Sequence, residues 1–102
     1  MLETTYVKQG NTLTVKPTGR LDTLTSPMLE KEMQQYLDGI TNVIMDFENL
    51  EYLSSGGLRL LLATEKLMEE RGGCLEVIHA NEYIIEVFAM VDFMDVIKVE
   101  QD

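Results

Sequence analysis

Apolar and polar positions alternate in two short stretches near the start of the chain. Residues 4–9 and 12–18 alternate or carry β-branched and aromatic side chains, and Gly10-Asn11 separates them. This pattern predicts a β-hairpin. We expect Pro17 near a strand end or at a sheet edge, because proline has no N–H to donate to a ladder.

Helical spacing and short apolar runs alternate through the rest of the chain. Apolar residues that recur every three or four positions predict helices, and continuous apolar runs between turn residues predict buried strands. Residues 48–51 are mostly polar, and we interpret them as a link. The expected elements after the hairpin are a helix that starts at Ser26-Pro27 and ends near Gly39, a strand at 42–47, a helix from about Leu58 to Arg71, a strand at 74–79, a helix capped by Asn81 and a possible short strand at 96–99.

The order of these elements is ββαβαβα, with a possible short terminal strand. Alternating strands and helices predict an α/β fold in which helices pack against a mixed β-sheet. No repeat or long linker divides the chain. We therefore expect one small domain over residues 1–102.

The charge of the chain excludes some classes of partner. Eighteen Asp and Glu residues against eight Lys and Arg give a net charge of -10 in 102 residues. A nucleic acid or an anionic membrane surface would be repelled by this charge. The sequence has no signal peptide and no apolar run near the roughly 20 residues that span a bilayer, so we expect a cytoplasmic protein. It also lacks the glycine-rich phosphate-binding motifs, so we expect no cofactor.

A single cysteine and a single histidine limit the possible catalytic chemistry. Cys74 and His79 both fall in the strand expected at 74–79, where packing explains them. One cysteine excludes an internal disulfide, and the pair leaves a zinc cluster without enough ligands, so we expect no metal site. A sugar-transport phosphocarrier would need one of the two on an exposed loop, which this interpretation disfavours. We do not expect an enzyme.

A pair of serines directly before a helix is the most informative feature. Ser54 and Ser55 follow a short connection from the apolar strand and precede Gly56-Gly57. A serine at this position can cap the helix and stabilise it by about 1 kcal/mol. The two glycines leave the hydroxyl groups unshielded, and a helix N-terminus tolerates an anion. Both a cap and a phosphorylation site are compatible with the residues.

Three short motifs carry a resemblance to a known family. They are GRLDT at 19–23, DF at 46–47 and YLSSGGLR at 52–59. Together with the order of strands and helices, they resemble the signature of STAS domains, particularly of bacterial anti-sigma-factor antagonists. The resemblance covers nearly the whole chain. It implies a small cytoplasmic protein that binds a serine-kinase anti-sigma factor when unmodified, dissociates when that kinase phosphorylates it, and is reset by a serine phosphatase.

The resemblance also assigns roles to individual residues. It places the phosphorylated serine at Ser55, with Ser54 as the second candidate, and maps two family acids onto Asp22 and Asp46. If both acids converge on the serine, a phosphate there would repel a partner. Asp22 could equally cap a turn. The residues expected to contact the partner are Asp22, Thr23, Ser54, Ser55, Gly56, Gly57 and Arg59.

Two other interpretations of the serines stay open. In a STAS scaffold that belongs to another signalling or transport assembly, they would be structural caps without a switch. A serine hydrolase is disfavoured, because the serine lacks a glycine on both sides and a base in the right chain order. Elsewhere on the second helix, Glu65, Glu69 and Glu70 are expected to form a solvated acidic face.

Overall fold

A β-hairpin opens the chain, as the alternation predicts. The structure, a computed structural model, describes residues 2–100. Strands β1 (Leu2–Gln9) and β2 (Thr12–Leu21) pair antiparallel along their length. Gly10 makes the turn between them at φ +61°, a conformation that glycine adopts at little cost.

Parallel pairing extends this hairpin into a mixed sheet. β3 (Asn42–Asp46) pairs parallel with β2, β5 (Leu75–Ile78) with β3, and β6 (Lys98–Val99) with β5. A further strand, β4 (Leu50–Leu53), pairs parallel with the other end of β2. The strand order is β1-β2-β3-β5-β6, and β4 branches off at β2. The predicted α/β fold with a mixed sheet is confirmed.

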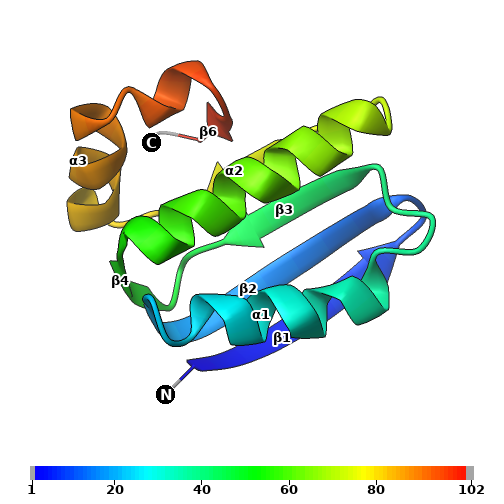
Figure 1. Cartoon of the computed structure of the whole chain (residues 1–102), viewed down its shortest axis with the longest axis horizontal. Helices are drawn as coiled ribbons and strands as arrows, with labels where there is room; N and C mark the ends of the chain where they lie inside the picture. Colours follow the sequence, from blue (N-terminus) through cyan, green and yellow to red (C-terminus); the bar gives the residue numbers. More distant parts are fainter. Residues whose placement is uncertain (1, 101–102) are drawn as a thin grey trace.

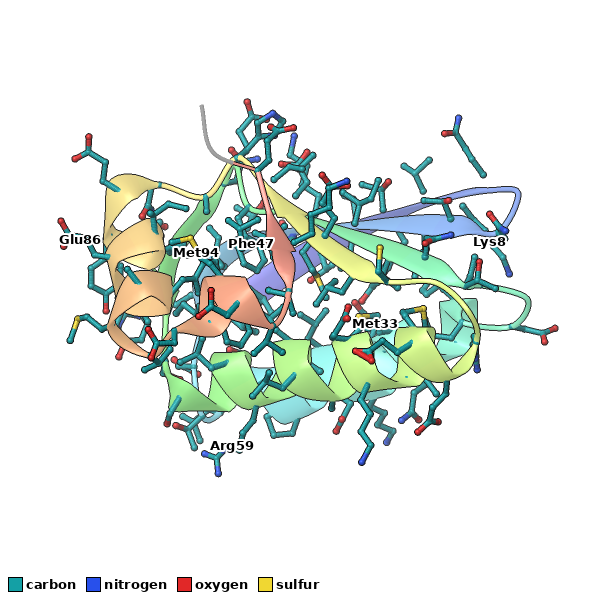
Figure 2. The ribbon with its side chains drawn as sticks, turned by 90° about the horizontal axis from the view of Figure 1, so that it is seen from above. Lys8, Met33, Phe47, Arg59, Glu86 and Met94 are labelled. Atoms are coloured by element: carbon teal, nitrogen blue, oxygen red, sulfur yellow. The ribbon has the colours of Figure 1, made fainter. Side chains whose placement is uncertain are left out.

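The helices of residues 26–33 and 55–70 form a layer on one face of this sheet, and the helix of residues 82–90 lies at one end of it (Figure 1). Figure 2 shows Met33 and Phe47 between that layer and the strands, and at most 2% of either side chain is exposed. No helix within residues 2–100 is long and apolar enough to cross a membrane. The helical elements are α1 (Ser26–Met33) with a 3₁₀ turn at Gln34–Tyr36, α2 (Ser55–Glu70), and α3 (Glu82–Met90) with a 3₁₀ turn at Phe93–Asp95.

Pro17 does not lie near a strand end, but it does lie at a local edge of the sheet. It lies in the middle of β2, opposite Thr4 of β1. On the other side, β3 pairs with β2 only as far as Val15, and β4 pairs only from Gly19 onward. Pro17 therefore occupies a stretch without a parallel neighbour, where a missing N–H costs little.

Two boundaries differ from the prediction around the serine pair. The supposed link at 48–51 contains the start of β4, and α2 begins at Ser55 rather than near Leu58. Gly56 and Gly57 lower the intrinsic helix propensity of the first turn of α2, so the sequence did not predict that turn. The connection from the strand to the helix is therefore short, and Ser54 is its last residue.

Cys74 and His79 are not buried. β5 covers only Leu75–Ile78, so both residues flank the strand and both are exposed. His79 also adopts φ +60°, the left-handed conformation that ends the strand. The burial expected for Cys74 and His79 is therefore no argument against a sugar-transport phosphocarrier.

Glu65 does not belong to a solvated acidic face. Only 7% of it is exposed, and its Oε1 accepts a hydrogen bond of 2.7 Å from the backbone N–H of Leu75. This bond ties α2 to the first residue of β5. Glu69 and Glu70 are exposed as expected.

Candidate functional site

The serine pair lies where β2 and β4 end side by side. Leu21 of β2 is paired with Leu53 of β4, and the backbone N–H of Ser54 donates to the carbonyl of Leu21 at 3.0 Å. The residue after each strand therefore starts a loop at the same end of the sheet. Figure 1 shows α2 beginning there, beside the connection from β2 to α1. This register brings Asp22 and Ser55 into one region.

Asp22 organises the connection from β2 to α1. Its Oδ1 accepts hydrogen bonds from the backbone N–H groups of Leu24 at 3.0 Å and Thr25 at 2.9 Å. The Thr25 N–H holds the pKa of the Asp22 carboxyl below its usual value, and the nearby Arg20 contributes in the same direction. Asp22 therefore caps a turn and presents a fixed negative charge beside the serines.

The two serines differ sharply in their surroundings. Ser54 precedes the helix with an extended backbone, but its side chain makes no capping bond. Its Oγ is buried, and within residues 2–100 it has no hydrogen-bond partner. Ser55 is the first residue of α2 and is exposed. The hydroxyl that an enzyme can reach is that of Ser55.

The two glycines allow the start of α2 to pack closely. A Cβ on Gly57 would collide with Cδ1 of Leu53 and would lie 3.1 Å from Cγ of Leu21. A Cβ on Gly56 would lie 3.2 Å from Cα of Thr23, in the Asp22 connection. Gly57 is buried, so it packs beneath the exposed residues at the start of α2. Of the residues expected to contact a partner, Thr23, Ser55 and Arg59 are exposed, and Asp22, Ser54 and Gly56 are partly buried.

A groove runs between α1 and α2 from the serine end. Its volume is about 470 Å³. Leu24 and Met28, beside this region on the connection and on α1, are 82% and 66% exposed. Polar, charged and apolar groups thus surround Ser55, as is typical of protein–protein contact surfaces. Residues that line the groove include Thr23, Ser26, Glu30, Gly56 and Arg59.

The expected convergence of Asp46 with Asp22 is wrong. Val15 pairs with Met45, so Asp46 lies beside Lys16, six residues before Asp22 on β2. That spacing is roughly 20 Å of strand. β4 separates the two acids along the sheet, because it continues the line of β3 toward the serines. Of these two acids, only Asp22 is placed to act near Ser55.

Asp46 instead pairs with His79. Its Oδ1 lies 2.9 Å from Nδ1 of His79 and accepts from the backbone N–H of Glu48 at 3.1 Å. Burial raises the pKa of Asp46, but the bonds from His79 and Glu48 outweigh it and lower the pKa overall. The hydrogen bond that His79 donates to the Asp46 carboxylate raises the pKa of His79.

Ligand atoms of Asp46, Glu48 and His79 lie within 4.8 Å of one another, the geometry of a possible cation site. However, Glu48 forms an ion pair of 2.9 Å with Lys16, and Asp46 is engaged by His79. A metal ion would have to displace both interactions. We assign no metal to this cluster.

The comparison with protein families decides the identity of the fold. The model of the STAS domain matches residues 3–102. The chain belongs to the STAS domain family. The residues that carried the resemblance, GRLDT at 19–23 and YLSSGGLR at 52–59, form the site built above.

Curated relatives of this STAS domain are anti-sigma factor antagonists. The anti-sigma-B factor antagonist of Bacillus subtilis is 24% identical over 94 residues, which cover 91% of this chain and 86% of the relative. The anti-sigma-B factor antagonist of Staphylococcus aureus is 30% identical over 90 residues, covering 85% and 82%.

Solved structures of the same fold include two close neighbours. The unphosphorylated form of the anti-sigma factor antagonist SpoIIAA superposes with a TM-score of 0.76 at 16% identity, over 98% of this chain and 89% of that one. A putative anti-sigma factor antagonist from Thermotoga maritima gives 0.88 at 15% identity, over 97% and 86%. At these identities the likeness establishes the fold.

One group of surface residues received no joint role from the sequence. Arg20, Tyr52 and Tyr83 stack on one another beside the serine end. Arg20 and Tyr52 lie in the family motifs, but Tyr83 is distant in sequence. Only the pairing of β4 with β2 and the position of α3 bring the three together.

Proposed function

We propose that this chain is an anti-sigma-factor antagonist that works by partner switching in the cytoplasm. Its unphosphorylated form binds a serine-kinase anti-sigma factor and thereby releases the sigma factor. Phosphorylation of Ser55 by that kinase ends the binding, and a serine phosphatase restores it. The chain acts as a substrate and a binding partner, not as an enzyme.

The exposed hydroxyl of Ser55 in a STAS domain carries this proposal. It stands at the first position of a 16-residue helix, beside the Asp22 connection and the groove between α1 and α2. Ser54 is a poorer acceptor, because its Oγ is buried. The names of the curated relatives supply the kind of partner.

The local charges support release by repulsion and not by unfolding. A phosphate adds about -1.5 to -2 charge, which the N-terminus of α2 tolerates. Asp22 has a lowered pKa, so its carboxylate is ionised beside the new phosphate. Arg59, four residues along α2, lies on the same helix face as Ser55 and is placed to contact a partner's carboxylate or the phosphate. Asp46 contributes nothing, since it lies with His79.

The test is a reaction with the anti-sigma kinase encoded by the same genome. We expect one phosphate on the wild-type chain in the presence of ATP, located at Ser55 by fragmentation mass spectrometry. Ser55→Ala should abolish the modification and keep the affinity for the kinase. Ser55→Glu should weaken that affinity. A complete switch from 99% bound to 99% free would require the free energy of binding to change by about 5.5 kcal/mol.

Two outcomes would overturn the proposal. If the kinase leaves both Ser54 and Ser55 unmodified, the switch does not exist. If Ser55→Glu binds as tightly as the wild type, the chain is a scaffold of the non-switching kind. Ser54→Ala is the matched control and should be phosphorylated normally.

A further inference from the structure

A stacked column of three side chains lies beside the serine end. The guanidinium Cζ of Arg20 lies 4.0 Å from the ring centroid of Tyr52. The Tyr52 ring in turn stacks on Tyr83, with centroids 5.9 Å apart and planes inclined by 18°. Arg20 is exposed, and 45% of Tyr83 is exposed. The column is therefore available to another molecule at both ends.

The backbone holds the three side chains in place. Arg20 of β2 and Tyr52 of β4 are paired residues, one position before the Leu21–Leu53 pair that leads to Ser54. Asn81, before α3, donates from Nδ2 to the carbonyl of Leu50 at 3.2 Å and so fixes the start of α3 against β4. Figure 1 shows β4, α3 and the start of α2 at the same end of the molecule. The column is continuous with the region around Ser55.

Arg20 has unused binding capacity. Within the part of the chain that the structure describes, its guanidinium makes no hydrogen bond and no ion pair, although its charge acts on Asp22. In contrast, Lys16 pairs with Glu48, and Arg71 donates to the carbonyls of Leu37 and Ile40. An arginine whose guanidinium is held over an aromatic ring keeps its planar set of donors for a carboxylate and loses little side-chain entropy on binding.

The chemistry of the column fits one kind of partner. Tyrosine and arginine are among the residues that most often dominate binding energy at protein interfaces. The column is cationic at Arg20 in a chain whose net charge is -10. The column therefore favours a partner that places an acidic group against Arg20, and not one whose whole contacting surface is basic.

We propose that the column of Arg20, Tyr52 and Tyr83 is a second docking point for the anti-sigma factor, where Arg20 receives a carboxylate of that protein and Tyr83 packs against an apolar side chain. This inference rests on the proposed function. The column lies outside the modified residue, so it contributes to the affinity for the anti-sigma factor, while Ser55 sets whether binding occurs.

The test measures affinity for the anti-sigma factor by calorimetry. Arg20→Glu and Tyr83→Ala should each weaken binding about tenfold or more, as expected for central interface residues. Arg20→Lys keeps the charge but loses the planar fork, and it should also weaken binding. Lys66→Glu makes the same charge change at an exposed position on α2, and Tyr36→Ala removes the partner of Tyr6 in a different surface stack. Both controls should leave affinity unchanged.

The outcomes separate this inference from the proposed function. If the wild type does not bind the anti-sigma factor, the proposed function fails. If Ser55→Glu weakens binding but Arg20→Glu and Tyr83→Ala match their controls, the switch stands and the second docking point is wrong. Thermal unfolding of every variant shows whether a loss of affinity merely follows a loss of fold.

Discussion

At the scale of single residues, burial distinguishes the hydroxyl groups of two neighbouring serines. Ser54 is held under the start of α2 by the bond from its N–H to Leu21, and this leaves its Oγ buried. Ser55 enters the helix one position later and faces solvent. Without the β2–β4 register, no pattern in the sequence could show which of the two is accessible.

Replacing Ser54 therefore has an unusual expected effect. A serine before a helix usually stabilises it by about 1 kcal/mol, but Ser54 makes no capping bond. Removing a buried hydroxyl without a partner relieves a desolvation cost of about 1 to 3 kcal/mol. We expect Ser54→Ala to leave the free energy of unfolding unchanged or to raise it, as measured by urea denaturation.

A true cap in the same protein is the control for this prediction. Asn81 accepts a hydrogen bond from the N–H of Ile84 at 2.9 Å. Asn81→Ala should therefore lower the free energy of unfolding by about 1 kcal/mol. An equal loss in Ser54→Ala would mean that its hydroxyl has a stabilising partner after all.

At the scale of elements, the sequence predicted most strands and helices because their patterns are local. The hairpin, the strand at 42–47 and the Asn81 cap follow from spacing and turn residues within a few positions. β4 does not, because its four residues are stabilised by pairing with β2, about thirty positions earlier. Similarly, the early start of α2 depends on Gly57 fitting against Leu21 and Leu53, which only the packing reveals.

The contact between α2 and β5 gives a prediction on pH. Burial, reinforced by Glu69, raises the pKa of Glu65 above its ordinary value of 4.5, even though the Leu75 N–H opposes this. The folded chain thus binds a proton more readily than the unfolded chain, and this group's contribution to stability falls as pH rises above about 4.5. Glu65→Gln keeps an acceptor for Leu75 and removes that dependence.

We expect Glu65→Gln to raise the free energy of unfolding at pH 7 relative to the wild type, and to give a smaller difference near pH 4. Urea denaturation at both pH values provides the measurement. Glu70→Gln removes the same charge from an exposed position of α2 and should not reproduce this change with pH. The opposite result, in which Glu65→Gln loses more stability relative to wild type at pH 7 than at pH 4, would show that the folded protein favours the ionised carboxylate.

At the scale of the whole molecule, the register of the sheet decides which distant residues form a site. The family motifs were visible in the sequence, and so was the candidate Ser55. The sequence could not show that Asp22 lies beside it, which depends on β4 pairing with β2, or that Asp46 lies with His79, which depends on β3 pairing with β5. The column of Arg20, Tyr52 and Tyr83 could not be predicted either, because it depends on the pairing of β4 with β2 and on the contact of α3 with β4.

The net charge of the whole chain predicts its response to salt. It carries -10, and within residues 2–100 only two side-chain ion pairs form, Lys16 with Glu48 and His79 with Asp46. Screening at pH 7 therefore relieves more repulsion than it removes attraction. We expect the melting temperature to rise between about 0.01 M and 0.15 M NaCl, where the Debye length shortens from about 30 Å to about 8 Å.

The same experiment near the isoelectric point is the control, because it removes the net charge. The pI is about 4.4, and there the long-range repulsion vanishes while the remaining opposite charges still attract. Salt should then leave the melting temperature unchanged or lower it. A melting temperature that falls with salt at pH 7 would mean that local attraction outweighs the net charge. In that case the stability of the fold would depend on its close charge pairs, Lys16 with Glu48 and His79 with Asp46, and not on the field of the whole chain.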